Sequence, residues 1–181
     1  MFARARYLFP VLWFAAVAAH ASEIFASHCK NGEVVFLNAK MHPVESNKFE
    51  RETGKEGPEM LLSLCSDRDT EPLRKLYYRF GVAGKAEIEL VASSQKKAGI
   101  FSQFDSGSHA GLVTIRFYMK PYEYEVGEGM GMTSGIRLTV YKDRKRIAYF
   151  ESHTEESQIV KIDFDRPSSP IFMHVNPIEP W

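Results

Sequence analysis

The sequence predicts a mainly β protein, an antiparallel sandwich or barrel with one long polar excursion and at most short helices. Apolar and polar residues alternate along several segments, which places each apolar set on one side of a strand. Turn residues separate these segments at short intervals, and short connections favour antiparallel pairing. No long segment shows the periodicity of a helix.

The expected strands follow one another along most of the chain. The alternation is clearest in Leu76–Phe80, Ala86–Leu90, Val113–Met119, Ile136–Tyr141 and Val160–Phe164. Further candidates are Glu33–Leu37, Met60–Cys65, Tyr122–Val126, Ile147–Ser152 and Ile171–Val175. Met60–Cys65 fits a short helix equally well, because its apolar residues are continuous.

Turn residues predict how these strands connect. Gly81–Gly84 divides two strands, and Lys142–Lys145 has the composition of a hairpin tip. We therefore expect an antiparallel hairpin over Val140–Phe150.

Two segments interrupt the strand pattern. Asn38–Glu59 is a long polar excursion, with room for a short helix near Glu45–Arg51. Pro167–Trp181 holds four prolines and is expected to pack as an extended tail.

The first 21 residues have the features of a secretory signal peptide. Arg4 and Arg6 precede the apolar run Tyr7–Ala19, and Ala19-His20-Ala21 fits a cleavage site with small residues. The alternative, an uncleaved anchor, requires a longer apolar run to span a bilayer. We expect residues 22–181 to form a single exported domain, periplasmic or secreted, with no integral membrane segment after cleavage.

Charge restricts the class of partner. The chain has 23 basic and 23 acidic residues, and removing the signal leaves a slightly acidic domain. Nucleic-acid-binding proteins usually carry a basic excess, so we expect no nucleic-acid partner. Lys142–Arg146 is interpreted as a charged hairpin tip, because Asp143 interrupts it.

The two cysteines, Cys29 and Cys65, are expected to form a disulfide in an oxidising compartment. A loop of about 36 residues gains roughly 3–4 kcal/mol from such a bond in the chain-entropy model. A redox pair is less well supported, since the sequence has no C-x-x-C motif. A metal site is supported only by the neighbouring His28.

A glycine-rich segment, Gly127–Gly135, predicts a mobile loop between strands. It lacks the Lys-Ser/Thr of a phosphate-binding loop, and a strand rather than a helix is expected to follow it. We interpret the loop as a partner-binding segment, in which glycines permit close backbone approach and methionines supply adaptable apolar contacts. Its candidate residues are Gly129, Met130, Gly131 and Met132.

A second candidate loop, Asp105–Gly111, brings together an aspartate, a serine and a histidine. Catalytic triads are assembled in space, so closeness in sequence does not identify one. We expect a turn here that presents Ser108 and His109 to a partner. The mature histidines form no compact ligand pair, and the acidic pairs Glu87/Glu89 and Glu123/Glu125 fit solvated strand faces. The sequence therefore assigns no catalytic residue, metal or cofactor.

Several motifs resemble a pattern found in small exported bacterial β-rich proteins of unknown function. The motifs are Leu62–Cys65, Leu76–Gly81, Ala86–Leu90, Tyr122–Tyr124 and Gly135–Val140, within residues 29–150. Similar proteins often carry a further cysteine after the last hairpin, which this chain lacks. The resemblance implies a periplasmic β-rich domain and assigns no activity.

We expect a non-enzymatic soluble periplasmic binding protein that recognises another envelope or secreted protein. One concrete version is an inhibitor or immunity protein acting on a cell-wall-degrading enzyme or toxin. One alternative is a hydrolase, which predicts a pocket holding His109 or His153 near a carboxylate or serine. The other is an envelope-assembly component, which predicts an open sheet edge or an extended apolar surface.

Overall fold

A computed structural model describes residues 26–44, 60–70, 72–105, 110–130, 135–153, 157–159 and 169–175. These residues form an 11-stranded sheet and contain no helix. The strands are β1 (Val34–Pro43), β2 (Met60–Ser66), β3 (Lys75–Val82), β4 (Lys85–Ser93), β5 (Ala98–Asp105), β6 (Ala110–Met119), β7 (Tyr122–Met130), β8 (Gly135–Lys142), β9 (Lys145–Ser152), β10 (Ser157–Ile159) and β11 (Phe172–His174).

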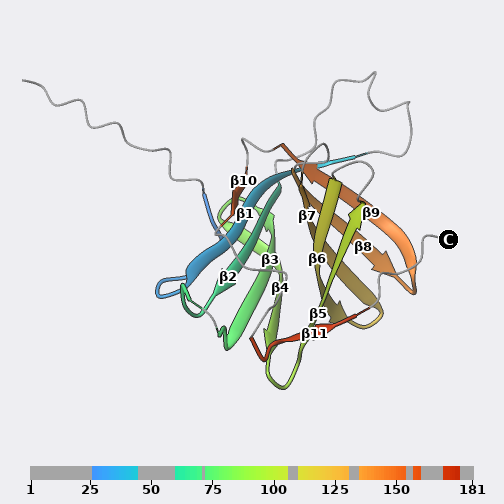
Figure 1. Ribbon diagram of the computed structural model, residues 1–181. Helices are drawn as coiled ribbons and strands as arrows, with labels where there is room; N and C mark the ends of the chain where they lie inside the picture. Colours follow the sequence, from blue (N-terminus) through green and yellow to red (C-terminus); the bar gives the residue numbers. More distant parts are fainter. Residues whose placement is uncertain are drawn as a thin grey trace, which may run out of the picture.

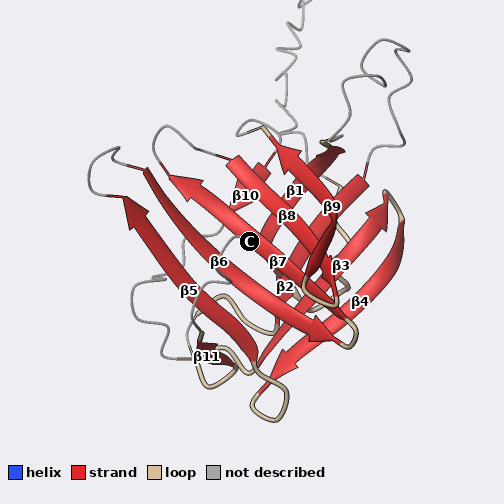
Figure 2. Cartoon of the chain, turned by 90° about the vertical axis from the view of Figure 1, so that its right-hand side faces the viewer, coloured by secondary structure: helices blue, strands red, loops and turns tan. Residues whose placement is uncertain are grey.

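The sheet is continuous and dominated by antiparallel pairs. Its strand order is β11-β5-β6-β7-β8-β9-β1-β2-β3-β4, and β10 pairs with β1 off this path. The sheet folds so that β1–β4 face β5–β9 (Figure 1), and it is not closed into a barrel. Figure 2 shows the same strands from the side, running from β5 to β4. The prediction of a mainly β, antiparallel fold is confirmed, and the sheet does not close into the barrel that was one of its two alternatives.

Strand β1 joins the two halves. Its residues from Val34 to Met41 pair with β2, whereas His42 and Pro43 pair with β9. A register shift between Val35 and Leu37 interrupts the pairing with β2, and bulges of this kind bend a strand. One strand therefore contributes to both facing halves.

The core lies between these halves and contains many aromatic rings. Tyr78 of β3 packs against Phe117 and Tyr124 of β6 and β7, with both pairs of ring centroids 5.3 Å apart. Phe80 meets Phe150 at 5.1 Å in an edge-on arrangement. Alternation along β3 places Tyr78 and Phe80 on this inner face, as the period of two predicts.

Met60–Cys65, which the sequence allowed to be either a strand or a short helix, forms a strand. β2 pairs with β1 on one edge and with β3 on the other, and its residues from Leu61 to Ser66 are all buried. A continuous apolar run suits a strand that is covered on both faces. Its continuity therefore reflects burial on two sides and not a helical turn.

Several other predicted elements either differ from the structure or lie outside the residues that it describes. β5 was absent from the predicted strands because glycine and polar residues interrupt its alternation. The predicted strand Ile171–Val175 is confirmed as β11, which lies within the segment expected as an extended tail and pairs in parallel with β5. The helix near Glu45–Arg51, the strand at Val160–Phe164 and the signal at residues 1–21 lie outside the described residues. Within the described part, no helix is long and apolar enough to cross a membrane.

Candidate functional site

The ends of the strands that flank the two predicted partner-binding loops lie side by side. β6 pairs with both β5 and β7, so Gly111 lies opposite Phe104 on one side and Met130 on the other. Gly129 in turn pairs with Gly135 at the start of β8. The sheet therefore brings the flanks of both loops to the same end, which we call the loop end.

The candidate residues themselves divide into two groups. Ser108, His109, Gly131 and Met132 lie outside the described residues. Gly129 and Met130 are the last two residues of β7, and both are paired with β6. The predicted mobile loop is thus shorter than the sequence indicated, because its first residues continue a strand.

One glycine of β7, Gly127, has a packing role that the sequence analysis missed. A Cβ atom built on Gly127 would lie 2.9 Å from Cδ1 of Leu112, which is closer than real side chains approach. A glycine here lets the Leu112 side chain of β6 cross the strand. The interpretation of Gly127 as a loop residue is therefore wrong.

One carboxyl group faces inward near the loop end. Glu128 is opposite Val113 and Ile136 in the register and has the same strand parity as the buried Tyr124 and Val126. Burial raises the pKa of the Glu128 carboxyl. It has no hydrogen-bond partner among the described residues.

Two histidines that are distant in sequence meet on the outside of the sheet. Pairing of β1 with β9 places His42 opposite Glu151, and the rings of His42 and His153 lie 6.2 Å apart. Both are exposed. The nearby Ser152 hydroxyl is buried and donates to the carbonyl of His153, so it is engaged in local structure and not positioned as a nucleophile.

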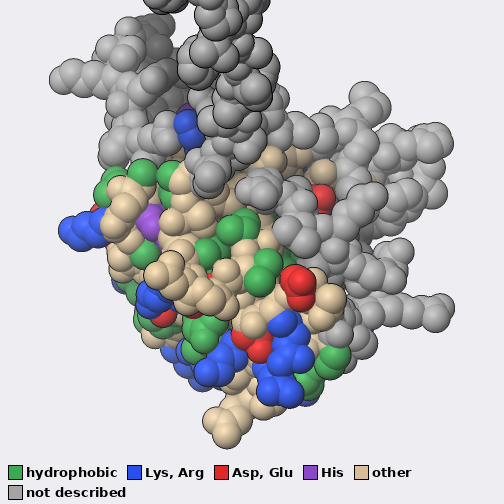
Figure 3. All heavy atoms as spheres, turned by 90° about the vertical axis from the view of Figure 1, so that its left-hand side faces the viewer, with side chains coloured by type: hydrophobic (Ala, Val, Ile, Leu, Met, Phe, Trp, Pro, Cys, Tyr) green, Lys and Arg blue, Asp and Glu red, His purple; other side chains and the backbone are tan. Residues whose placement is uncertain are grey.

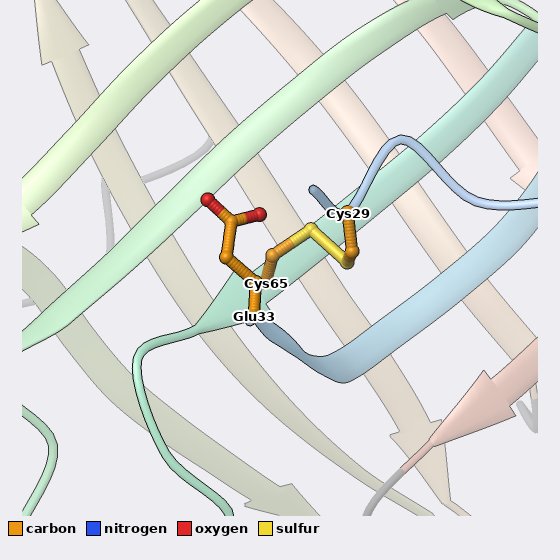
Figure 4. Close-up of side chains that lie close together, drawn as sticks. All are labelled: Cys29, Glu33 and Cys65. Carbon is orange, nitrogen blue, oxygen red and sulfur yellow. A yellow bond between two sulfur atoms is a disulfide. The ribbon is translucent and has the colours of Figure 1, made fainter. Parts of the chain in front are cut away.

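An N-terminal strap, residues 26–33, is held against the outside of β2 and β3. The predicted disulfide between Cys29 and Cys65 fixes its centre (Figure 4). The backbone N–H of His28 donates to Ser63 Oγ at 3.0 Å, and Ser63 Oγ donates to Asn38 Oδ1 at 2.6 Å. A covalent bond and a chain of buried hydrogen bonds thus secure the strap.

Arg79 lies beneath the strap and is the centre of a buried ion-pair network. Its side chain is only 1% exposed. The guanidinium donates to both oxygens of Glu33, to Glu89 at 2.9 Å and to the carbonyl of His28 at 3.2 Å. It also lies 4.9 Å from the centre of the Tyr77 ring.

The network shifts the pKa values of its members in the directions expected for ion pairs. Hydrogen bonding to Arg79 lowers the pKa of Glu33, and hydrogen bonding to Arg79 and Lys30 lowers that of Glu89. The bond to Glu33 raises the pKa of Arg79. Glu89 lies on an exposed strand face, as predicted, but the prediction missed that its carboxylate pairs with both Arg79 and Lys30.

The residues around the disulfide are of types that bind metal ions, but their ligand atoms are already engaged in other interactions. Cys29, Glu33 and Cys65 bring a potential ligand atom each within 4.8 Å of the others. However, the two sulfur atoms are bonded to each other, and the carboxylate of Glu33 accepts hydrogen bonds from the guanidinium of Arg79. The arrangement therefore attaches the strap to the sheet.

A second buried ion pair occupies the outer side of β6 and β7. Arg116 donates to Glu125 from Nη2 at 2.8 Å and from Nε at 3.2 Å. Its guanidinium lies 4.9 Å from the centre of the Phe101 ring. The assignment of Glu125 to a solvated face is also wrong, since its side chain is paired and mostly buried.

Strand β4 ends the sheet order and bears on the envelope-assembly alternative. Its outer positions carry Lys85, Glu87 and Glu89. Charged side chains on an edge strand oppose addition of another strand. The charge pattern of β4 therefore disfavours assembly through this edge.

Within the described residues, the flanks of the two candidate loops lie together. The disulfide and the buried ion pairs have structural roles. The disulfide is consistent with an oxidising, extracytoplasmic location. Comparisons with protein-family models, with curated proteins and with solved structures found no match.

Proposed function

We propose that this protein is a non-enzymatic binding protein of the periplasm that uses its loop end to recognise another envelope or secreted protein. The observation that carries the proposal is the pairing of β6 with both β5 and β7. Ser108 and His109 lie in one segment, and Gly131 and Met132 lie in another. The pairing places the strand ends that flank these two segments next to each other. Two connections anchored next to each other on a sheet are a common arrangement for recognition.

The scaffold supports this role because its loop flanks are held by a rigid sheet. β5, β6, β7 and β8 are joined by uninterrupted pairing up to the loop end. The strap is attached by a disulfide on another part of the sheet and leaves this end unoccupied by its own residues. Preorganised flanks reduce the entropy that ordering a binding loop costs.

Inhibition of a cell-wall-degrading enzyme or a secreted toxin is the form of the proposal that can be tested directly. Residues 106–109 and 131–134 are replaced, separately and together, with serine-glycine sequences of equal length. Replacement is preferable to deletion because Gly129 and Gly135 pair across β7 and β8. The matched control replaces Ser94 and Gln95, which are exposed in the turn between β4 and β5.

The assay measures binding to, and inhibition of, purified peptidoglycan hydrolases and toxins of the same host. The proposal expects inhibition by the unaltered protein and by the Ser94/Gln95 control, and a loss of at least tenfold in affinity in the loop variants. Absence of binding across the panel, or binding that survives both loop replacements, would overturn it.

A further inference from the structure

The end of the sheet opposite the loop end carries a concentration of basic side chains. They lie in the strap and in the connections β2–β3, β4–β5, β6–β7 and β8–β9, and they are Lys30, Arg68, Arg74, Lys75, Lys96, Lys97, Lys120, Lys142, Arg144, Lys145 and Arg146. The described acidic residues there are fewer: Glu33, Asp67, Asp69, Asp143 and, at the register level of Arg146, Glu123. We call this surface the basic end, and Figure 3 shows Lys and Arg side chains gathering on the lower part of one face.

Register and hydrogen bonds show that these connections adjoin one another. Lys75 is opposite Ser93, whose N–H donates to the carbonyl of Lys96. At the other side, the N–H of Asp143 donates to the carbonyl of Pro121 at 3.1 Å. The hairpin tip of β8 and β9 therefore rests on the β6–β7 turn.

A small cleft connects these two groups of turns. It is lined by residues of β4 and β6 and by the β4–β5 turn, including Lys96, Lys97 and Tyr118. The next residues of β6 lead directly into the turn containing Lys120. The basic end is thus one surface that crosses both halves of the sheet.

Most of these cations form no ion pair with the described residues, although Lys142 lies 5.6 Å from the centre of the Tyr122 ring and Arg146 lies 5.5 Å from that of Tyr149. Lys30 pairs with Glu89, and Arg68 pairs with Asp67. By contrast, the other nine form no ion pair or side-chain hydrogen bond with the described residues: Arg74, Lys75, Lys96, Lys97, Lys120, Lys142, Arg144, Lys145 and Arg146. Their charge is available to an external anion.

The β8–β9 turn has a backbone conformation that glycine adopts at the lowest cost. Asp143 and Arg144 have φ angles of 50° and 66°. Two-residue hairpin turns of this type favour glycine because both central residues need positive φ. The chain instead places an exposed cation, Arg144, at the tip.

Exposed apolar side chains lie among the cations. Met119 is 39% exposed beside Lys120, and Ile147 is 55% exposed beside Arg146. Basic and apolar groups together are the combination that adsorbs to an anionic bilayer, where cations meet headgroups and apolar tips enter the interface.

We propose that the basic end docks the protein on a membrane surface containing anionic phospholipid. The strap and four connections between strands supply the charge, and Met119 and Ile147 supply apolar contacts. The loop end, at the opposite ends of the same strands, then faces away from the bilayer. The neutral total charge of the chain conceals this surface, because the charge is unevenly distributed.

The test measures binding of the purified protein to vesicles by flotation. Vesicles of phosphatidylglycerol mixed with phosphatidylcholine are compared with vesicles of phosphatidylcholine alone, and soluble polyphosphate serves as a lipid-free anion. The proposal expects binding to the anionic vesicles only, weakening as salt screens the charges. Equal binding to both kinds of vesicle, or to neither, would overturn it.

Variants separate the electrostatic and the apolar contributions. Each basic residue near an anionic surface contributes about 1 kcal/mol, so Lys145→Gln should weaken vesicle binding about fivefold. Lys85→Gln is the matched control, because Lys85 is exposed near the loop end and should have no effect. Equal effects of the two substitutions would contradict a localised docking surface.

The apolar variants distinguish a lipid surface from a soluble polyanion. Ile147→Ser and Met119→Ser should weaken binding to anionic vesicles and leave any binding to polyphosphate unchanged. If vesicle binding is insensitive to both substitutions, the surface recognises anionic polymers and the lipid assignment is overturned. These substitutions lie far from the loop end, so this outcome leaves the proposed partner recognition to its own test.

Discussion

The buried Arg79 network leads to a prediction about two carboxylates that contact the same guanidinium. Glu33 has a side chain only 13% exposed and uses both oxygens, whereas the Glu89 side chain is 44% exposed. Removing one partner of a buried pair costs about 3–5 kcal/mol. Because Arg79 retains Glu89, we expect Glu33→Gln to lower the free energy of unfolding by about 3 kcal/mol, at the low end of that range.

The matched substitution is Glu89→Gln. Exposed ion pairs contribute at most about 1 kcal/mol, so we expect a loss below that value. Urea denaturation at neutral pH measures both variants, provided that the slope with denaturant is unchanged. A larger loss for Glu89→Gln than for Glu33→Gln would refute the assignment of Glu33 as the principal partner of Arg79.

Acidification should show the same network with a definite sign. The pKa values of Glu33 and Glu89 are lower in the folded protein than the ordinary 4.5. Their contribution is therefore complete above pH 4.5 and is lost as pH falls through the folded-state values. Stability of the unaltered protein should fall over this acidic range, and Glu33→Gln should reduce the slope. An unchanged slope in the variant would contradict the linkage.

Three further predictions concern the disulfide, a close backbone approach and a buried hydroxyl. Reducing the Cys29–Cys65 bond should lower the free energy of unfolding by about 4 kcal/mol for a loop of this length, measured in urea with and without reductant. A change below about 1 kcal/mol would indicate that the loop keeps residual structure in the unfolded state. Gly81→Ala should cost about 2–3 kcal/mol in the same assay, since its Cβ would lie 2.4 Å from a backbone oxygen of Lys85, and an unaltered stability would exclude this close approach. Tyr78→Phe should raise stability by about 1 kcal/mol in thermal or urea unfolding, because the buried hydroxyl has no hydrogen-bond partner among the described residues, and a marked loss would show that it has one.

The strand composition of the fold was predictable because the sheet has one apolar face. In β3 and β8 the inward positions are apolar and the outward ones are mostly polar, so the period of two is visible in the sequence. β5 gave little such signal, since glycine and polar residues interrupt its alternation. The strand β11 was expected, but its parallel pairing with β5 joins residues distant in the chain. The order of the strands depends on the same distant contacts.

The disulfide was predictable from composition, whereas the ion pairs were hidden by the assumption that charged residues on alternating positions face solvent. Arg79 and Glu89 are directly opposite in the β3–β4 hairpin, and pairing outward from its turn indicates their proximity. The burial of Arg79 depends on the strap, whose course over β3 is not visible in local sequence. The same applies to the meeting of His42 and His153, which requires β1 to reach β9.

The position of β1 also has a consequence for the order of folding. β1 begins at Val34. At its C-terminal end, His42 and Pro43 pair with β9, near Phe150. The local hairpins can form as soon as their residues leave the ribosome, whereas β1 has an incomplete edge until β9 and then β10, which pairs with Leu37–Ala39, have been synthesised. An incomplete strand edge is a template for pairing with another chain. We therefore expect the nascent protein to be most prone to aggregation before β10 emerges, and a chaperone that covers β1 during that interval to improve its yield.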